Sequence, residues 1–261
     1  MKSKLRLRLG TLTILVALII TGCTSTSQQT TQITPQPGQH AYTYEMSGTN
    51  LNYLLFLPRS YGRDPQQQWP LMIFLHGLAK RGDTIAALEE LKKDGPPMIV
   101  EERPDFPFIV LSPQCPSDSY WEGQLNQVDE LVDEVVHNYA ADTSRIYLTG
   151  LSMGGYGSWH YALSESEQFA AIVPIAGGHI PQSDEVPDNI CDLKDTPTWV
   201  FHGDQDDVVL PRQSEVLVEA LEACGSDVRF TLYPGADHDD SWKHAYNDPQ
   251  LYEWLLEQAL E

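Results

Sequence analysis

Residues 145–155 read RIYLTGLSMGG, and their pattern is the clearest indication of the fold. Its first half is an apolar run typical of a buried strand, and an amphipathic segment follows its second half. Between the two, Gly150 and Gly154 flank Ser152 in the pattern Gly-x-Ser-x-Gly. A serine in this pattern lies on a sharp turn between a strand and a helix, where Cβ atoms two residues to either side would collide with their surroundings. The stretch therefore predicts a nucleophilic serine hydroxyl presented above a sheet.

Outward from this turn, short apolar runs alternate with helical patterns over residues 41–261. Such alternation is typical of an α/β domain, in which helices cover both faces of a mostly parallel sheet. The first two strands are expected to form an antiparallel hairpin. Predicted strands cover residues 42–46, 51–57, 71–76, 108–111, 146–150, 171–176, 198–202 and 228–233, and predicted helices cover residues 85–93, 128–139, 154–163, 214–223 and 251–260. The hydrophobic content of 41% can build the core of one catalytic domain over this length.

Residues 1–22 have the composition of a signal peptide. Positive charges come first, a mostly apolar run over residues 11–20 follows, and small residues then lead to Cys23. The apolar run would span only about 15 Å as a helix, about half of a bilayer's hydrocarbon core. The Gly22-Cys23 junction resembles the lipobox of bacterial lipoproteins, which implies cleavage before Cys23 and acylation of its thiol. An ordinary signal peptide followed by an incidental cysteine is the alternative.

Residues 23–40 are rich in Ser, Thr, Gln and Pro and contain few apolar side chains, so they are expected to form a flexible tether. Two or more acyl chains on Cys23 would make a stable anchor. We therefore expect an exported protein that is held by lipid to a bacterial membrane, on its periplasmic or cell-surface side.

Three further cysteines follow the tether. In an oxidising compartment one disulfide can form, and Cys191 with Cys224 is the expected pair because both flank predicted strands in the C-terminal half. Cys115 would then stay free. Three reduced, buried thiols are the alternative.

The formal net charge of -21 excludes several partners. An acidic surface repels nucleic acid, and no run of Lys or Arg offers a compensating basic patch. Residues 237–240 form an acidic cluster around His238, but no second ligand group with metal-site spacing accompanies it, so no metal is expected. Acyl transfer by a serine needs no cofactor either.

A serine is a weak nucleophile unless a histidine accepts its proton and a carboxylate orients that histidine. The acid is expected in the segment HGDQDDVV, residues 202–209, which follows a predicted strand and offers Asp204, Asp206 and Asp207. The base is expected after the last strand, where His238 stands. His76 and His202 precede glycines at strand ends and are instead expected to bond the backbone.

Two backbone N–H groups are expected to form an oxyanion hole, one from Met153 after the serine and one from Leu78 in the loop after the third strand. The aromatic side chains of Tyr120, Trp121 and Trp242 stand near the predicted catalytic loops. They are expected either to line the substrate pocket or to pack in the core.

Six segments together resemble one family: WPLMIFLHG, RGD, SPQCP, GLSMGG, HGDQDDVV and DHDDSW. They are similar to the dienelactone-hydrolase and feruloyl-esterase-like branch of the α/β hydrolases, which includes predicted peptidases of prolyl-oligopeptidase type. The resemblance covers residues 50–260, and it implies an α/β-hydrolase fold with Asp206 as the acid and His238 as the base. Two departures are Asp237, where a glycine is usual, and residues 78–80, where a loop richer in glycine and glutamate is common.

The sequence thus favours a serine esterase that hydrolyses short-acyl, aryl or polysaccharide-linked esters. The short stretch between residues 176 and 206 leaves little room for a cap, so an open site is expected. A serine peptidase or amidase with the same triad is the main alternative. A surface lipoprotein that binds a ligand without catalysis is the other.

Overall fold

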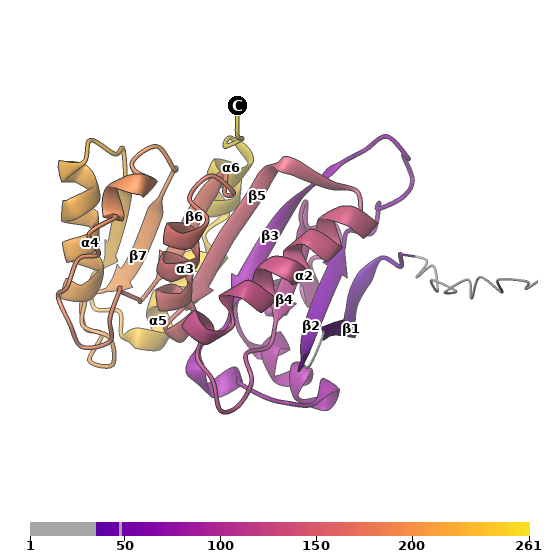
Figure 1. The fold of residues 1–261 in the computed structure, drawn as a ribbon, viewed down its shortest axis with the longest axis horizontal. Helices are drawn as coiled ribbons and strands as arrows, with labels where there is room; N and C mark the ends of the chain where they lie inside the picture. Colours follow the sequence, from indigo (N-terminus) through magenta and orange to yellow (C-terminus); the bar gives the residue numbers. More distant parts are fainter. Residues whose placement is uncertain (1–34, 47–48) are drawn as a thin grey trace, which may run out of the picture. The chain divides into compact units, whose positions relative to one another are not determined.

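The computed structural model describes residues 35–46 and 49–261, which form an eight-stranded sheet (Figure 1). The strand order is β1-β2-β4-β3-β5-β6-β7-β8. β1 pairs antiparallel with β2, and β2 with β4, whereas the other pairs are parallel. The strands are β1 Gly38–Met46, β2 Thr49–Leu57, β3 Trp69–Leu75, β4 Ile109–Pro113, β5 Ala141–Leu151, β6 Ala171–Ile175, β7 Trp199–Gly203 and β8 Arg229–Tyr233. The predicted mostly parallel sheet with an N-terminal antiparallel hairpin is confirmed.

Helices cover both faces of the sheet. They are α1 Gly95–Glu102, α2 Leu125–Asn138, α3 Met153–Ser164, α4 Arg212–Ala223, α5 His238–Asn247 and α6 Pro249–Leu256, with 3₁₀ helices η1 Leu78–Lys80, η2 Ile85–Lys93, η3 Trp121–Gly123 and η4 Ile190–Leu193. Apolar residues of α2, α3 and α4 pack in one cluster, and those of α1, α5 and α6 pack in another. Successive residues of β3 alternate between the two clusters, because neighbouring side chains of a strand point to opposite faces.

Two α-helices, α1 and α5, have no counterpart in the sequence prediction, and one predicted helix differs in type. α1 begins Gly95-Pro96-Pro97, a combination that breaks a helical pattern although proline is tolerated in a first turn. α5 begins with the polar residues His238, Asp239 and Asp240, and these obscure the apolar periodicity that would predict a helix. Residues 85–93 form the 3₁₀ helix η2 instead of an α-helix.

The start of β1 corrects the expected tether, because residues 38–40 belong to that strand. The side chain of Gln39 donates a hydrogen bond to the carbonyl of Pro97 (2.9 Å), which holds this end against α1. The expected signal peptide over residues 1–22, the lipid site Cys23 and the tether up to residue 34 lie outside the described residues. None of the helices within the described residues is both long and apolar enough to span a membrane.

The structure joins Cys191 of η4 to Cys224 at the end of α4 in a disulfide, the expected pair, with Cα atoms 5.4 Å apart. Cys115 is free and buried. Burial raises the pKa of its thiol to about 12, so the thiol stays protonated and unreactive at neutral pH.

Candidate active site

Ser152 lies on a strained turn between the central strand β5 and helix α3. Its backbone has φ +55°, a region that residues with a side chain rarely adopt, and its N–H donates to the carbonyl of Ile175 (2.9 Å). A Cβ on Gly154 would stand 1.8 Å from the carbonyl oxygen of Leu75, and one on Gly150 would stand 2.2 Å from that of Gly154. Both glycines are therefore required by close backbone packing, as the motif predicts.

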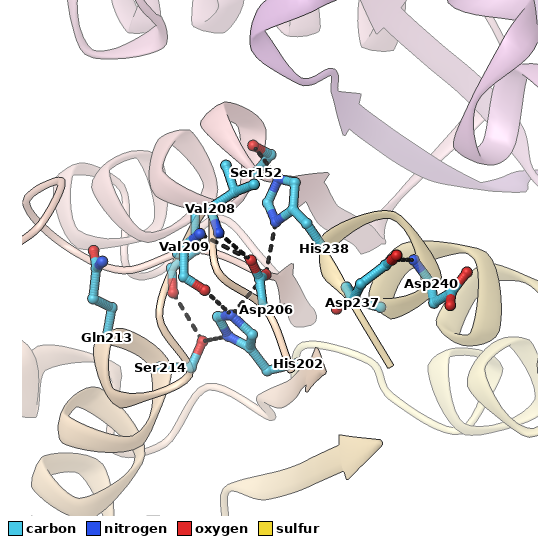
Figure 2. Close-up of polar contacts among 12 residues, drawn as sticks. Ser152, His202, Asp206, Val208, Val209, Gln213, Ser214, Asp237, His238 and Asp240 are labelled. Carbon is cyan, nitrogen blue, oxygen red and sulfur yellow. Dashed lines mark hydrogen bonds and ion pairs between the residues drawn. The ribbon is translucent and has the colours of Figure 1, made fainter. Parts of the chain in front are cut away.

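The structure brings Ser152, Asp206 and His238 together at the carboxyl ends of the parallel strands (Figure 2). His238 Nε2 lies 2.9 Å from Ser152 Oγ, and His238 Nδ1 lies 2.7 Å from Asp206 Oδ2. His238 is the first residue of α5, and Asp237 caps that helix by accepting a hydrogen bond from the N–H of Asp240 (2.9 Å). Asp237, which departs from the family pattern, thus helps to place the histidine.

Asp206 is the aspartate of segment 202–209 that reaches the histidine. Asp204 accepts a hydrogen bond from the N–H of Gly235 (2.7 Å), which ties two turns together, and Asp207 is exposed. The Asp206 side chain is completely buried, and its Oδ1 accepts from the N–H groups of Val208 (3.0 Å) and Val209 (2.9 Å).

Opposing effects act on the pKa of Asp206. Burial alone raises it, but the neighbouring imidazoles of His202 and His238 and the N–H of Val209 outweigh burial and hold the pKa well below its ordinary value. Asp206 is therefore ionised at neutral pH. Because its folded-state pKa is depressed, it stabilises the fold above the pKa of an unfolded aspartate, and this contribution is lost as the pH falls through the folded pKa.

The two expected oxyanion donors lie at the start of helical turns. Met153 is the first residue of α3 and Leu78 is the first of η1, positions whose N–H groups have no acceptor within the helix. A Cβ on Gly77 would stand 3.6 Å from the Cβ of Ser152, so the loop passes directly beside the serine. Met153 directly follows Ser152, and Leu78 lines the same cavity as Ser152, so the prediction that their N–H groups form the oxyanion hole stays open to test.

A cavity of about 610 Å³ opens at Ser152. It is lined by Gly77, Leu78, Ala79, Lys80, Arg81, Asp94, Leu151, Ser152, His238, Asp239 and Trp242. Trp242 lines this cavity and also packs in the core, so the two alternatives left open for it both describe its position. The sequence did not indicate the four charged residues of this lining, because their positions carry no periodic signal. They are Lys80, Arg81, Asp94 and Asp239. Lys80 and Asp94 form an ion pair at 3.1 Å.

Two expected pocket residues are corrected. Trp121 is fully buried and does not line the cavity; its indole N–H donates to the carbonyl of His76 (2.9 Å), and its ring packs on that imidazole. Tyr120 is 57% exposed and does not line the cavity either. The guanidinium of Arg81 covers its ring at 5.1 Å. Both aromatics follow β4 and contact the loop beyond β3, Trp121 at His76 and Tyr120 at Arg81.

Comparison with known proteins identifies the family. The family model for phospholipases and carboxylesterases matches residues 61–246. The chain belongs to the phospholipase/carboxylesterase family. A crystal structure of a thermostable esterase, 33% identical, superposes with a TM-score of 0.71 over 85% of this chain and 63% of its own.

Two curated relatives of this family member are an acyl-protein thioesterase and an acetylxylan esterase. Acyl-protein thioesterase 1 of Gibberella zeae is 25% identical over 66% of this chain and 84% of its own length. A bifunctional acetylxylan esterase/xylanase of Neocallimastix patriciarum is 28% identical over 41% of this chain. The match spans only 16% of that relative. The protein accordingly has the α/β-hydrolase fold of this family.

The oxyanion loop, residues 76–83, is clamped to the segment 114–121 that follows β4. Gln114 Nε2 donates to the carbonyl of Lys80 (3.0 Å), and the N–H of Gly82 donates to the carbonyl of Cys115 (3.0 Å). Arg81 donates to the carbonyl of Ser119 (2.8 Å). The SPQCP motif therefore fixes the loop that carries Leu78.

His76 is the buried centre of this clamp. Its Nε2 accepts from the N–H of Cys115 (3.0 Å), and its Nδ1 donates to the carbonyl of Gly77 (2.7 Å). Burial lowers the pKa of His76 to about 4, so the ring is neutral and its tautomer is defined. The expectation that His76 bonds the backbone is confirmed.

His202 bonds the backbone too, through Nε2 to the carbonyl of Val209 (2.8 Å). Sequence reasoning missed its second contact: the same Nε2 lies 3.2 Å from Asp206 Oδ2, and both side chains are completely buried (Figure 2). Because Nε2 faces two acceptors, it carries a proton. Its Nδ1 lies 2.7 Å from Ser214 Oγ, which in turn donates to the carbonyl of Gly177 (2.8 Å). The HG-x-x-D spacing was the available signal, because it puts the two residues at either end of one tight turn.

Replacing His202 with phenylalanine is expected to lower kcat for ester hydrolysis by about tenfold to a hundredfold, since a hydrogen bond to a charged group contributes about 1.5 to 3 kcal/mol. His202→Gln, which keeps a donor in the region of Nε2, should recover part of the loss. Steady-state rates and thermal melting of both variants check this. If His202→Phe and His202→Gln were equally stable and had equal rates, the hydrogen-bond donor at this position would have no effect on catalysis.

Proposed function

We propose that the protein is a serine esterase that hydrolyses carboxylic esters through an acyl-enzyme on Ser152. The observation that carries this is the hydrogen-bonded series Ser152–His238–Asp206 at an open cavity. His238 Nε2 removes the hydroxyl proton as Oγ attacks the ester carbonyl, and the N–H groups of Met153 and Leu78 face the oxyanion. His238 then protonates the leaving alcohol. Water, deprotonated by the same imidazole, releases the acid and restores the serine.

We favour short acyl groups, acetyl above all, on a polysaccharide or another bulky alcohol. β6 ends at Ile175 and β7 begins at Trp199, and the stretch between them holds only the short helix η4, so it builds no cap over the cavity. An uncovered site admits an acyl group carried on a large polymer. The acetylxylan esterase relative supports the same substrate class.

Hydrolysis of p-nitrophenyl esters from acetate to palmitate tests the proposal. We expect kcat/KM to be highest for the shortest acyl groups, and a fluorophosphonate probe to label Ser152. The matched acetyl p-nitroanilide should be cleaved far more slowly, because an anilide is a poorer leaving group than a phenolate. A tenfold preference for long chains would exclude the short-acyl pocket, faster anilide cleavage would favour the amidase alternative, and an inert, unlabelled protein would exclude the triad mechanism.

A further inference from the structure

A second hollow, of about 440 Å³, is lined by the continuation of the loop that walls the catalytic cavity. Lys80 and Arg81 line the catalytic cavity, and the next residues, Gly82 and Asp83, line the second hollow. The β1–β2 hairpin and the residues after β4 complete it. We call it the amide groove and define it by Thr43, Asn50, Asn52, Asp83, Ile85 and Gln114.

The chemistry of the amide groove selects a neutral, polar ligand. Three carboxamides and a hydroxyl supply both donors and acceptors, and no Lys or Arg is among its described lining residues. The single carboxylate, Asp83, already accepts from the N–H (2.9 Å) and the hydroxyl of Ser117. An anionic ligand would find no cation there, and an apolar ligand would leave the amides unpaired. A ligand rich in hydroxyl groups carries no negative charge and can pair with the amides.

Gln114 adds an independent indication of a ligand. The residue is 1% exposed and lines the groove, and its Nε2 donates to the carbonyl of Lys80 (3.0 Å). Its Oε1 is buried and has no hydrogen-bond partner among the described residues. A buried acceptor without a partner is costly. A hydroxyl donor in the groove, directly or through one water, would satisfy it.

Two further features suit a sugar ring. Thr43 donates to the side-chain oxygen of Asn52 (2.8 Å), so that amide is held in one orientation with its N–H₂ left for a ligand. Ile85 is 51% exposed at the edge of the groove, where it offers an apolar surface to the C–H face of a pyranose. The groove thus combines oriented amides with one exposed apolar side chain.

Building on the proposed esterase function, we propose that the amide groove binds a neutral polysaccharide chain and presents the ester groups on that chain to Ser152. The two hollows share consecutive residues of one loop, and Gln114 contacts both through its bond to Lys80. The two hollows therefore meet at residues 80–83, and in this proposal a chain lying in the groove reaches the catalytic cavity across these residues. Small esters need only the cavity, whereas the polymer uses both.

The test compares acetylated xylan with p-nitrophenyl acetate on variants of Asn50, an exposed residue outside the catalytic machinery. Asn50→Trp fills the groove and Asn50→Ala removes one amide. Asn138→Ala, on the exposed end of α2, is the matched control. Gln114 is unsuitable because it also holds the oxyanion loop. We expect Asn50→Trp to raise KM for xylan about tenfold, the loss of one or two net hydrogen bonds, with unchanged kcat and unchanged hydrolysis of p-nitrophenyl acetate.

The outcomes separate this proposal from the esterase function. If both Asn50 variants hydrolyse p-nitrophenyl acetate at the wild-type rate and keep the wild-type KM for xylan, the groove does not bind the polysaccharide, but the esterase function stands. The same conclusion follows if the variants lose activity equally on both substrates. If the wild type is inert on both, the esterase function fails. Calorimetric titration with xylohexaose then decides the groove alone: binding that Asn50→Trp abolishes supports it, and no binding to the wild type overturns it.

Discussion

Ser152→Ala is expected to lower kcat on p-nitrophenyl acetate by about 10⁵-fold to 10⁶-fold, the scale on which other serine hydrolases lose activity without their nucleophile. In the wild type, His238 Nε2 lies 2.9 Å from the Ser152 hydroxyl; alanine removes this hydroxyl, so the imidazole has no group to deprotonate. No acyl-enzyme can then form, and the remaining rate comes from binding and the oxyanion donors alone.

Ser164→Ala is the matched control for this change. Ser164 ends the same helix, α3, and its hydroxyl donates to the carbonyl of Tyr161 (2.9 Å). That variant should keep wild-type kcat. If Ser152→Ala retained more than about a hundredth of the activity, the acyl-enzyme mechanism would be wrong, whatever the control showed.

Asp206→Asn is expected to lower kcat about 10⁴-fold at pH 7, as the same change does in a triad protease. The N–H groups of Val208 and Val209 both point at Oδ1, so the carboxamide oxygen must take that position. Its NH₂ group then occupies the place of Oδ2 and faces His238 Nδ1. Because the amide donates to Nδ1, the proton of the neutral imidazole must lie on Nε2. Nε2 can then no longer accept the proton of Ser152.

The neighbouring variant Asp207→Asn controls for the loss of one negative charge in the same turn, because Asp207 is exposed. It should retain the wild-type rate. We would measure kcat and KM for both variants between pH 6 and 8. Since the pKa of Asp206 lies well below its ordinary value, the wild type holds the carboxylate over this whole range, so the comparison is between a carboxylate and an amide at every pH measured. A deficit below tenfold would remove Asp206 from the mechanism.

The sequence predicts the fold and the positions of Ser152 and His238 because these depend on local patterns, whereas Asp206 is selected by the family resemblance. Strands and helices follow periodic runs, and Ser152 is marked by two glycines that close backbone contacts require. Three aspartates near one another could not be separated by pattern alone. They differ in the structure because only Asp206 is turned inward, by two backbone N–H groups that no sequence period encodes.

Contacts between distant loops could not be predicted in the same way. Trp121 meets His76 across 45 residues, and Gln114 meets Lys80 across 34, with no pattern in the intervening chain to indicate either. An aromatic side chain beside catalytic loops can face a ligand or the core, and only the packing decides. Helix α5 was hidden for a different reason: its cap, Asp237, stands in a cluster of acidic residues that suggests a loop.

The clamp on the oxyanion loop leaves some side chains of the loop free to vary, while it fixes the main chain. Its contacts come from His76, Arg81 and Asp83 and from the main chain of Lys80 and Gly82, and the group that the proposed reaction takes from Leu78 is a main-chain N–H. The side chains of residues 78–80 therefore carry none of these duties, although they line the cavity. Relatives can exchange them, and so change which substrate they accept, while the donor stays in place.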